Sequence, residues 1–164
     1  MPIMPPQSCT ASVTGLVSGA ASSGVVATAE PIRELAGHVP ARNAGVGHAI
    51  VDATNGELLG GIGIRSEGDG RFEVGYWVRH ERRRRGIASR ALRLISVWAL
   101  GDLGAERVQL HADVENVPSQ RVAENAGFTR EGVLRSWLEH RGERRDHVLY
   151  SLLATEWPTQ TLGS

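Results

Sequence analysis

The chain has 164 residues, and equal numbers of basic and acidic side chains give it a formal net charge of +0. This length suits one globular domain and excludes two ordinary ones, and the charge balance argues against a globally basic nucleic-acid binder. A single cysteine, Cys9, excludes an intrachain disulfide and a cysteine-based zinc cluster. No apolar run is long enough for a membrane helix, and the absence of lysine from the sequence excludes lysine catalysis.

The ends of the chain differ in composition from its middle. Residues 1–45 are dominated by Ala, Ser, Gly, Thr, Val and Pro, and we interpret them as an atypical, partly disordered segment. Within it, Pro31 and Gly37 favour a short helix between them. Gly and Ser interrupt the apolar stretch that a secretory signal would need, so we expect a cytoplasmic protein. Residues 46–157 are predicted to form the folded domain and residues 158–164 a tail.

The hydrophobic pattern predicts alternating strands and helices from residue 47 onward. Asn55-Gly56 favours a tight hairpin turn with two positive φ angles, and period-two alternation puts Phe72, Val74, Tyr76 and Val78 on one strand face. Ser119 is the expected N-cap of the second helix, and Gly127 follows its end. Strands are predicted at 48–53, 57–65, 72–78, 107–114, 128–139 and 145–153, and helices at 87–103 and 119–125. The order indicates a mixed α/β (α+β) domain around one sheet.

The segment from Val78 to Ala88 is the most informative for function. A strand is followed by an arginine-rich loop, Arg82 to Arg85, and then by Gly86 at the start of a long helix. The first turn of a helix has free amide groups and the positive end of the helix dipole, and a glycine there allows close approach to the backbone. This arrangement suits a phosphate group. Four consecutive arginines also suit a solvated or polyanion-binding surface, and that alternative stays open.

The motifs around this loop resemble those of the GNAT N-acetyltransferases. Arg83-Arg84-Arg85-Gly86-Ile87-Ala88 fits the family's Gln/Arg-x-x-Gly-x-Gly/Ala signature, and Gly75-Tyr76-Trp77-Val78 precedes it. The segments Asn116–Phe128, Arg130–Arg135 and Asp146–Leu152 resemble the branch of ribosomal-protein N-terminal acetyltransferases, the RimJ/RimL-like enzymes. The resemblance implies a GNAT fold: one mixed, mostly antiparallel sheet, a splay between its central strands, and helices packed on its faces. The family's opening strand and first helix are expected to be missing or replaced.

Carried over residue by residue, the resemblance implies an acetyl-CoA site and no metal. The backbone of Tyr76, Trp77 and Val78 would pair with the pantetheine arm and polarise the thioester carbonyl. Asn116 and Ser119 would contact the cofactor from the next strand's side. The pyrophosphate would lie against the backbone amides of Arg83, Arg84, Arg85, Gly86, Ile87 and Ala88. Arg84 replaces a residue that is usually glycine in this branch, which bulks the loop without removing its amides.

Direct acetyl transfer to an amine needs a base for the amine and an acid for the departing thiolate. Glu73 and His111 are both candidates for the base; the alternatives are an ion pair for Glu73 and a structural sheet histidine for His111. Many GNAT enzymes place a tyrosine acid where this chain has Ala123, so that role is vacant. Ser119 is the candidate substitute, with a plain helix cap as its alternative.

The predicted function is acetyl-CoA-dependent transfer of an acetyl group to a primary amine, either a protein N-terminus or a small molecule. One alternative is a degenerate GNAT domain that binds CoA without turnover. The other is polyanion or nucleic-acid binding through Arg79 to Arg93, which the lack of interleaved aromatic residues disfavours. A homodimer through the C-terminal strands is compatible with the sequence, and no membrane partner is expected.

Overall fold

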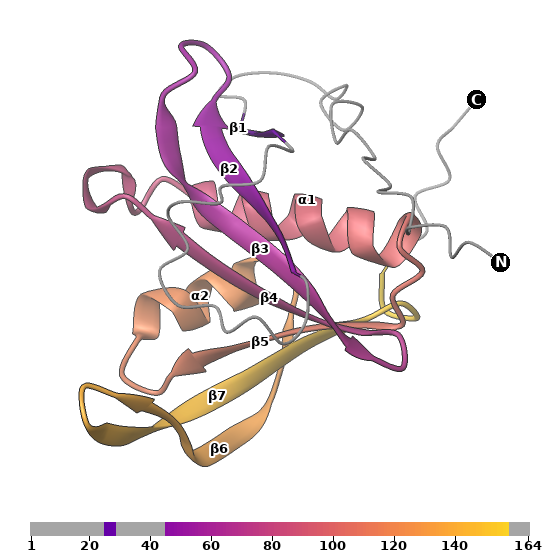
Figure 1. Cartoon of the computed structure of the whole chain (residues 1–164), viewed down its shortest axis with the longest axis vertical. Helices are drawn as coiled ribbons and strands as arrows, with labels where there is room; N and C mark the ends of the chain where they lie inside the picture. The colour runs from indigo at the N-terminus through magenta and orange to yellow at the C-terminus, as the bar shows by residue number, and fades with distance from the viewer. Residues whose placement is uncertain (1–24, 29–44, 158–164) are drawn as a thin grey trace, which may run out of the picture.

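A computed structural model describes residues 25–28 and 45–157 of the chain (Figure 1). None of the helices in this part of the chain has both the length and the apolar character needed to cross a membrane. A short 3-10 turn, His80–Arg82, precedes the first helix. In chain order the elements are β1 Val25–Thr28, β2 Val46–Asp52, β3 Leu58–Gly68, β4 Arg71–Val78, α1 Ile87–Gly101, β5 Arg107–Asp113, α2 Val117–Asn125, β6 Thr129–His140 and β7 Glu143–Leu153.

The strands form one sheet in the order β1-β2-β3-β4-β5-β7-β6. Every neighbouring pair is antiparallel except β4 and β5, which run parallel. A parallel pair needs a crossover connection, and α1 supplies it between these two strands. The predicted mixed, mostly antiparallel sheet is therefore confirmed.

The central strands β4 and β5 diverge soon after they begin to pair. Their ladder has only three residue pairs, Arg71 with Arg107, Phe72 with Val108 and Glu73 with Gln109. On its other side β4 stays paired with β3 as far as Val78. The edge of β4 that faces β5 thus has no strand partner from Val74 to Val78, and its backbone groups there need another partner. This is the predicted splay.

The core lies on the face of the sheet that both helices cover (Figure 1). Alternate residues of the central strands are buried there, including Val74, Val108 and Leu110, against α1 residues such as Leu92 and Ile95. The two helices α1 and α2 contact each other and pack on this same face. The other face, which carries Glu73 and His111, has no helix over it within the described part of the chain.

A strand is present where none was expected. Val25–Thr28 pairs antiparallel with residues 49–52 of β2, inside the segment that we interpreted as atypical. Three of its four residues are β-branched, which favours strand, but the run is short and lies between Gly/Ser-rich stretches. The helix predicted at 31–37, Cys9 and the 158–164 tail lie outside the described residues.

The hairpin between β2 and β3 is longer than the predicted two-residue turn. Only Gly56 has a positive φ, +73°; Asn55 does not. The Gly56 amide donates to the Asp52 carbonyl at 2.8 Å, and the Asn55 side-chain oxygen accepts from the Glu57 amide at 2.8 Å. The asparagine therefore closes the turn through its side chain instead of through a left-handed backbone. This places Glu57 immediately before β3, where it reaches the arginine-rich loop.

Candidate functional site

The loop before α1 has the backbone geometry of an anion site. Gly86, the N-cap residue, has φ +69°, and no side chain caps the helix. Going along α1 from its start, the Arg90 amide is the first to donate a backbone hydrogen bond, and its acceptor is the Gly86 carbonyl at 3.1 Å. The amides of Ile87 to Ser89 are therefore at the open end of the helix. A Cβ on Gly86 would have only the Arg90 guanidinium, at 3.7 Å, within 4 Å, so the space over this glycine is open.

The arginines of this loop divide into anchored and exposed side chains. Arg82 binds Glu57 through two nitrogens, at 3.2 and 2.5 Å, and Arg79 approaches the same carboxylate at 3.9 Å. Arg83 donates to the Val78 carbonyl at 3.2 Å. These contacts tie the loop to β3 and to the end of β4. Among the described residues no ion pair involves Arg84 or Arg85, and both are exposed.

Arg84 stands in a backbone conformation that favours glycine. Its φ is +62°, which is uncommon for a residue with a Cβ. The resemblance to the RimJ/RimL-like branch implies glycine at this position, and a positive φ is the conformation that glycine adopts readily. The loop retains the glycine conformation and gains an exposed guanidinium beside the open end of α1.

The unpaired edge of β4 leads from this loop toward Glu73. Trp77 lies on the face without helices and is 43% exposed. Two glycines of β3 make room for it: a Cβ on Gly61 would lie 2.6 Å from the Trp77 indole nitrogen, and one on Gly60 would lie 2.2 Å from the Trp77 carbonyl oxygen. The β3 glycines thus set how closely β4 approaches β3, and they leave the opposite edge of Tyr76 to Val78 facing the splay.

Tyr76 spans the splay on the helix face. Its hydroxyl lies 3.0 Å from the Ser119 hydroxyl and donates to the Ser119 carbonyl at 3.2 Å. Burial raises the pKa of the Tyr76 phenol, although the hydrogen bond with Ser119 lowers it, so the phenol is protonated at neutral pH. The family resemblance implied a role for the backbone of Tyr76 and none for its hydroxyl.

The predicted cap at Ser119 is wrong. The helix begins at Val117, its N-cap is Asn116, and the Asn116 side-chain oxygen accepts from the Ser119 amide at 3.2 Å. Pro118 at the start of the helix fits this earlier boundary. The Ser119 hydroxyl therefore does not cap the helix, and it faces the Tyr76 hydroxyl. Ala123, at the position where the family resemblance would place a tyrosine acid, is 0% exposed and belongs to the core.

Glu73 and His111 lie together where β4 and β5 diverge. His111 Nε2 is 3.3 Å from Glu73 Oε1, and Arg65 donates to the same oxygen at 2.9 Å. Burial raises the pKa of Glu73, but the His111 hydrogen bond and the charges of His111 and Arg65 outweigh it, so the pKa falls below its usual range. The carboxyl is therefore ionised at neutral pH. The two candidate bases form one pair, which their separation in the sequence did not indicate.

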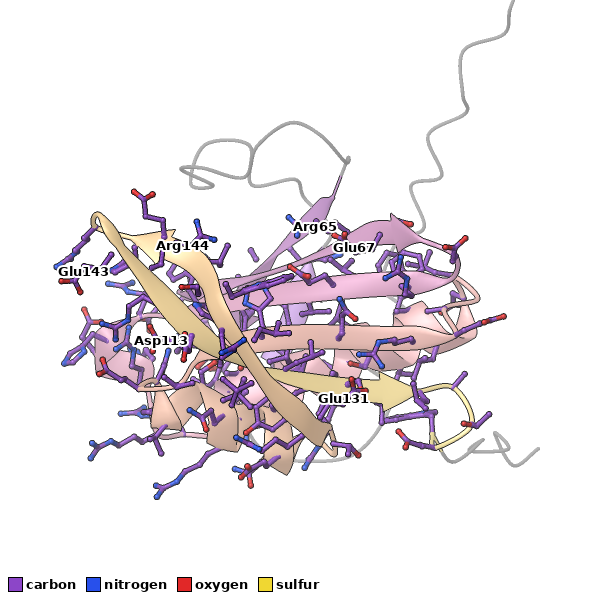
Figure 2. The ribbon with its side chains drawn as sticks, turned by 90° about the horizontal axis from the view of Figure 1, so that it is seen from below. Arg65, Glu67, Asp113, Glu131, Glu143 and Arg144 are labelled. Atoms are coloured by element: carbon purple, nitrogen blue, oxygen red, sulfur yellow. The ribbon has the colours of Figure 1, made fainter. Side chains whose placement is uncertain are left out.

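This pair lies at the wall of a pocket on the face without helices. The pocket has a volume of about 480 Å³ and combines charged with apolar side chains: Arg71, Glu73, Arg107, Gln109, His111, Glu131, Leu134, Trp137 and Leu149. Arg107 holds Glu131 in a two-point ion pair at 2.6 and 3.0 Å. Arg65 and Glu131 are labelled in Figure 2, which views the molecule from below. Glu131, Leu134 and Leu149 lie in segments that carry the family resemblance, but we predicted no site role for them or for Trp137.

A family model for the acetyltransferase (GNAT) domain matches residues 22–129, more than half of the chain. A curated relative from Bacillus subtilis, "Putative ribosomal N-acetyltransferase YdaF", is 36% identical over 105 residues, which are 63% of this chain and 57% of YdaF. Mycobacterium smegmatis RimJ in complex with CoA-disulfide is 32% identical with a TM-score of 0.65, over 70% of this chain and 55% of RimJ. A "putative ribosomal-protein-serine acetyltransferase" from Vibrio cholerae is 25% identical with a TM-score of 0.61, over 66% of this chain and 64% of that protein.

The chain belongs to the GNAT acetyltransferase domain family, because the family model covers most of its length and includes the splay, the loop before α1 and α2. Its similarity to ribosomal N-acetyltransferases agrees with the RimJ/RimL-like branch indicated by the sequence. The matched region spans less than two thirds of the length of YdaF and RimJ.

Proposed function

We propose that this protein is an N-acetyltransferase that moves an acetyl group from acetyl-CoA to a primary amine. The observation that carries the proposal is the unpaired edge of β4, which begins next to Glu73 and ends at the loop before α1. One end of this edge has the partly buried carboxylate of Glu73 and the other has the open amides of a helix. An extended ligand with amide groups at one end and phosphates at the other suits such a channel.

The residues present fit acetyl-CoA. The backbone from Tyr76 to Val78 would bind the pantetheine arm in place of a strand, and the amides from Arg83 to Ala88 would bind the pyrophosphate. Exposed Arg84 and Arg85 would add charge-assisted contacts to phosphate. Asn116 and Ser119 would line the arm from α2. RimJ, a relative of this chain, has been solved with CoA-disulfide, which supports the assignment of this ligand.

For the chemistry, bound acetyl-CoA supplies a thioester carbonyl as the electrophile. We assign Glu73 as the base that takes the proton from the attacking amine, because its carboxylate is ionised and held by Arg65 and His111. The nitrogen forms a bond to the acetyl carbon, and the carbon–sulfur bond breaks. The thiolate of CoA needs a proton, and the Ser119–Tyr76 hydroxyl pair on the helix face is the donor that we propose.

For the acceptor, we propose a protein N-terminus. This is supported by the names of the relatives, which refer to ribosomal substrates. It is also supported by the open pocket beside Glu73, which offers charged and apolar side chains to more than a bare amine. A small-molecule amine is the alternative acceptor.

The first test is thermal unfolding of the full chain with and without acetyl-CoA. A ligand at 100 times its Kd adds about 2.7 kcal/mol to the native state, a shift in Tm of roughly 2–8 °C for a domain near this size. The second test incubates the protein with acetyl-CoA and peptides that begin with Ser, Ala or Met, and detects acetylated peptide by mass spectrometry. Peptides blocked at the N-terminus are the control.

Three outcomes separate the candidates. A shift with acetylated peptide supports the proposal. A shift without transfer to peptides or small amines favours the degenerate CoA-binding domain. Absence of a shift, with steeply salt-dependent binding to DNA or RNA, favours the polyanion surface. The contacts of Arg79 and Arg82 with Glu57 argue against this last possibility, because they engage two arginines of the proposed patch within the protein.

A further inference from the structure

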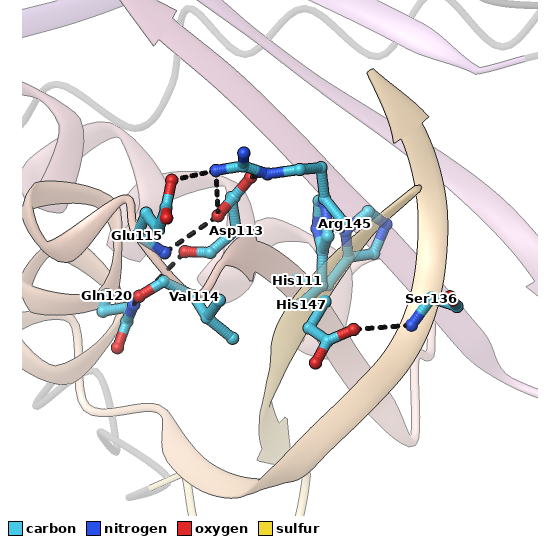
Figure 3. Close-up of polar contacts among 9 residues, drawn as sticks. His111, Asp113, Val114, Glu115, Gln120, Ser136, Arg145 and His147 are labelled. Carbon is cyan, nitrogen blue, oxygen red and sulfur yellow. Dashed lines mark hydrogen bonds and ion pairs between the residues drawn. The ribbon is translucent and has the colours of Figure 1, made fainter. Parts of the chain in front are cut away.

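A third side chain, His147, continues the Glu73–His111 pair across the sheet. His111 Nδ1 lies 2.9 Å from His147 Nδ1, while the opposite nitrogen of His111, Nε2, faces Glu73 at 3.3 Å. The three residues come from β4, β5 and β7, and His147 is opposite Asp113 in the β5–β7 ladder. Figure 3 shows the two histidines beside each other, close to the contacts that Arg145 makes with Asp113 and Glu115.

The chemistry of these contacts determines where the ring protons lie. An ionised carboxylate only accepts hydrogen bonds, so His111 must carry a hydrogen on Nε2 to bind Glu73. Two Nδ1 atoms at 2.9 Å form a hydrogen bond only if one proton lies between them. With His111 neutral, its single proton is on Nε2, and the proton between the rings therefore belongs to His147. In this state His147 Nδ1–H donates to His111 Nδ1.

The surrounding residues hold this arrangement in place. The Trp137 ring packs edge-on against His111, with ring centroids 5.9 Å apart. Asp146, next to His147, accepts from the Ser136 amide at 2.7 Å, and this contact ties β7 to an irregular part of β6. On the other side Arg145 binds Asp113 at 2.9 Å. His111 is thus confined between a carboxylate, a second imidazole and an indole.

We propose that His147 is a positioning residue for acetyl transfer: it donates to His111 Nδ1 and so keeps the His111 proton on Nε2, directed at the base Glu73. This inference rests on the proposed function. Without the donor, the His111 proton could move to Nδ1, and a bare Nε2 lone pair would then face the carboxylate. Glu73 would lose a hydrogen bond that orients it.

Burial is the main cause that lowers the pKa of His147, and the nearby charge of His111 adds to it. The other charged groups around His147 are Asp113 on β5 and Arg145 and Asp146 on β7, and Leu134 is its opposite residue on β6. A lowered pKa keeps His147 neutral near neutral pH, with its single ring proton available for His111.

The test compares His147→Leu with His147→Asn in the full chain. The side-chain amide of asparagine can donate a hydrogen bond from about the position of the His147 Nδ1 atom, whereas leucine has no hydrogen-bond donor in its side chain. His140→Leu is the matched control, because His140 is exposed at the end of β6. We expect His147→Leu to lower kcat about tenfold, a part of what a general base contributes, with an unchanged KM for acetyl-CoA. His147→Asn should restore kcat.

Two readouts keep this inference separate from the proposed function. Nitrogen NMR of the histidine rings reports the tautomer of His111 without any turnover, and it should show Nε2–H in the natural protein and in His147→Asn, with mixed tautomers in His147→Leu. Equal kcat for all variants, or His111 as the Nε2–H tautomer in His147→Leu, would overturn the role of His147. A natural protein that binds acetyl-CoA but acetylates no amine would overturn the proposed function, and the NMR result would still test the tautomer.

Discussion

Two glycines at opposite ends of α1 allow the anion site to be tested against a matched control. Gly86 precedes the helix with φ +69°, and Gly104 follows it with φ +66°. A Cβ on Gly86 would meet nothing closer than 3.7 Å, and one on Gly104 would meet nothing within 4 Å. Gly86→Ala and Gly104→Ala thus introduce the same backbone strain and no clash. They differ only in which end of the helix they alter.

Both substitutions should cost about 1 kcal/mol of unfolding free energy, because alanine is strained at positive φ. That corresponds to a Tm lower by about 3 °C in a chain of this size. Only Gly86→Ala places a methyl group where a phosphate must approach the amides of α1. Loss of one charge-assisted hydrogen bond, about 1.5–3 kcal/mol, weakens CoA binding by about 10–150-fold. Gly86→Glu, which adds a negative charge there, should abolish binding.

The assay is isothermal titration of CoA into the natural protein and the three variants, with a thermal melt of each. The expected result is equal loss of Tm in the two alanine variants and a higher Kd in Gly86→Ala alone. If Gly86→Ala bound CoA as tightly as Gly104→Ala, the open end of α1 would not be the phosphate site.

Three further predictions concern α2 and the core. Ser119→Ala removes the hydroxyl 3.0 Å from the Tyr76 phenol but not the Asn116 cap, so kcat should fall about tenfold with CoA affinity retained; an unchanged kcat in steady-state assays would exclude the hydroxyl from the reaction. Asn116→Ala removes the cap and should cost about 1 kcal/mol in denaturant unfolding, and equal stability would contradict the capping role. Burial lowers the pKa of His48, so the unfolded chain binds the proton more readily and stability should fall as pH drops below about 6.5. His48→Leu should reduce that loss in melts at pH 5 and pH 8, and an equal loss in both proteins would assign it to other groups.

The elements around the anion site were predictable because their signals are local. Alternation from Phe72 to Val78 predicts a strand with one buried face, and β4 shows it. Gly86 before an amphipathic run predicts the start of a helix, and α1 begins at the next residue. Each signal depends on side chains a few positions apart, which share a face through the period of the element.

Two local predictions failed where competing signals were close together. Ser119 and Asn116 are both good capping residues three positions apart, and Asn116 caps the helix because Pro118 suits the first turn. The four-residue strand β1 lacks enough length for a visible alternation. Pairing with β2, a tertiary interaction, forms this strand.

By itself, the sequence determined the order of strands and helices after residue 45 and the position of the loop before α1, since hydrophobic period, glycine and proline act over a few residues. The tertiary structure decided what meets at the splay: Glu73 with His111, His111 with His147, and Tyr76 with Ser119. These pairs join strands and a helix that are distant in the chain. Their contacts depend on sheet order and register, which follow from packing of the whole domain and not from any local pattern.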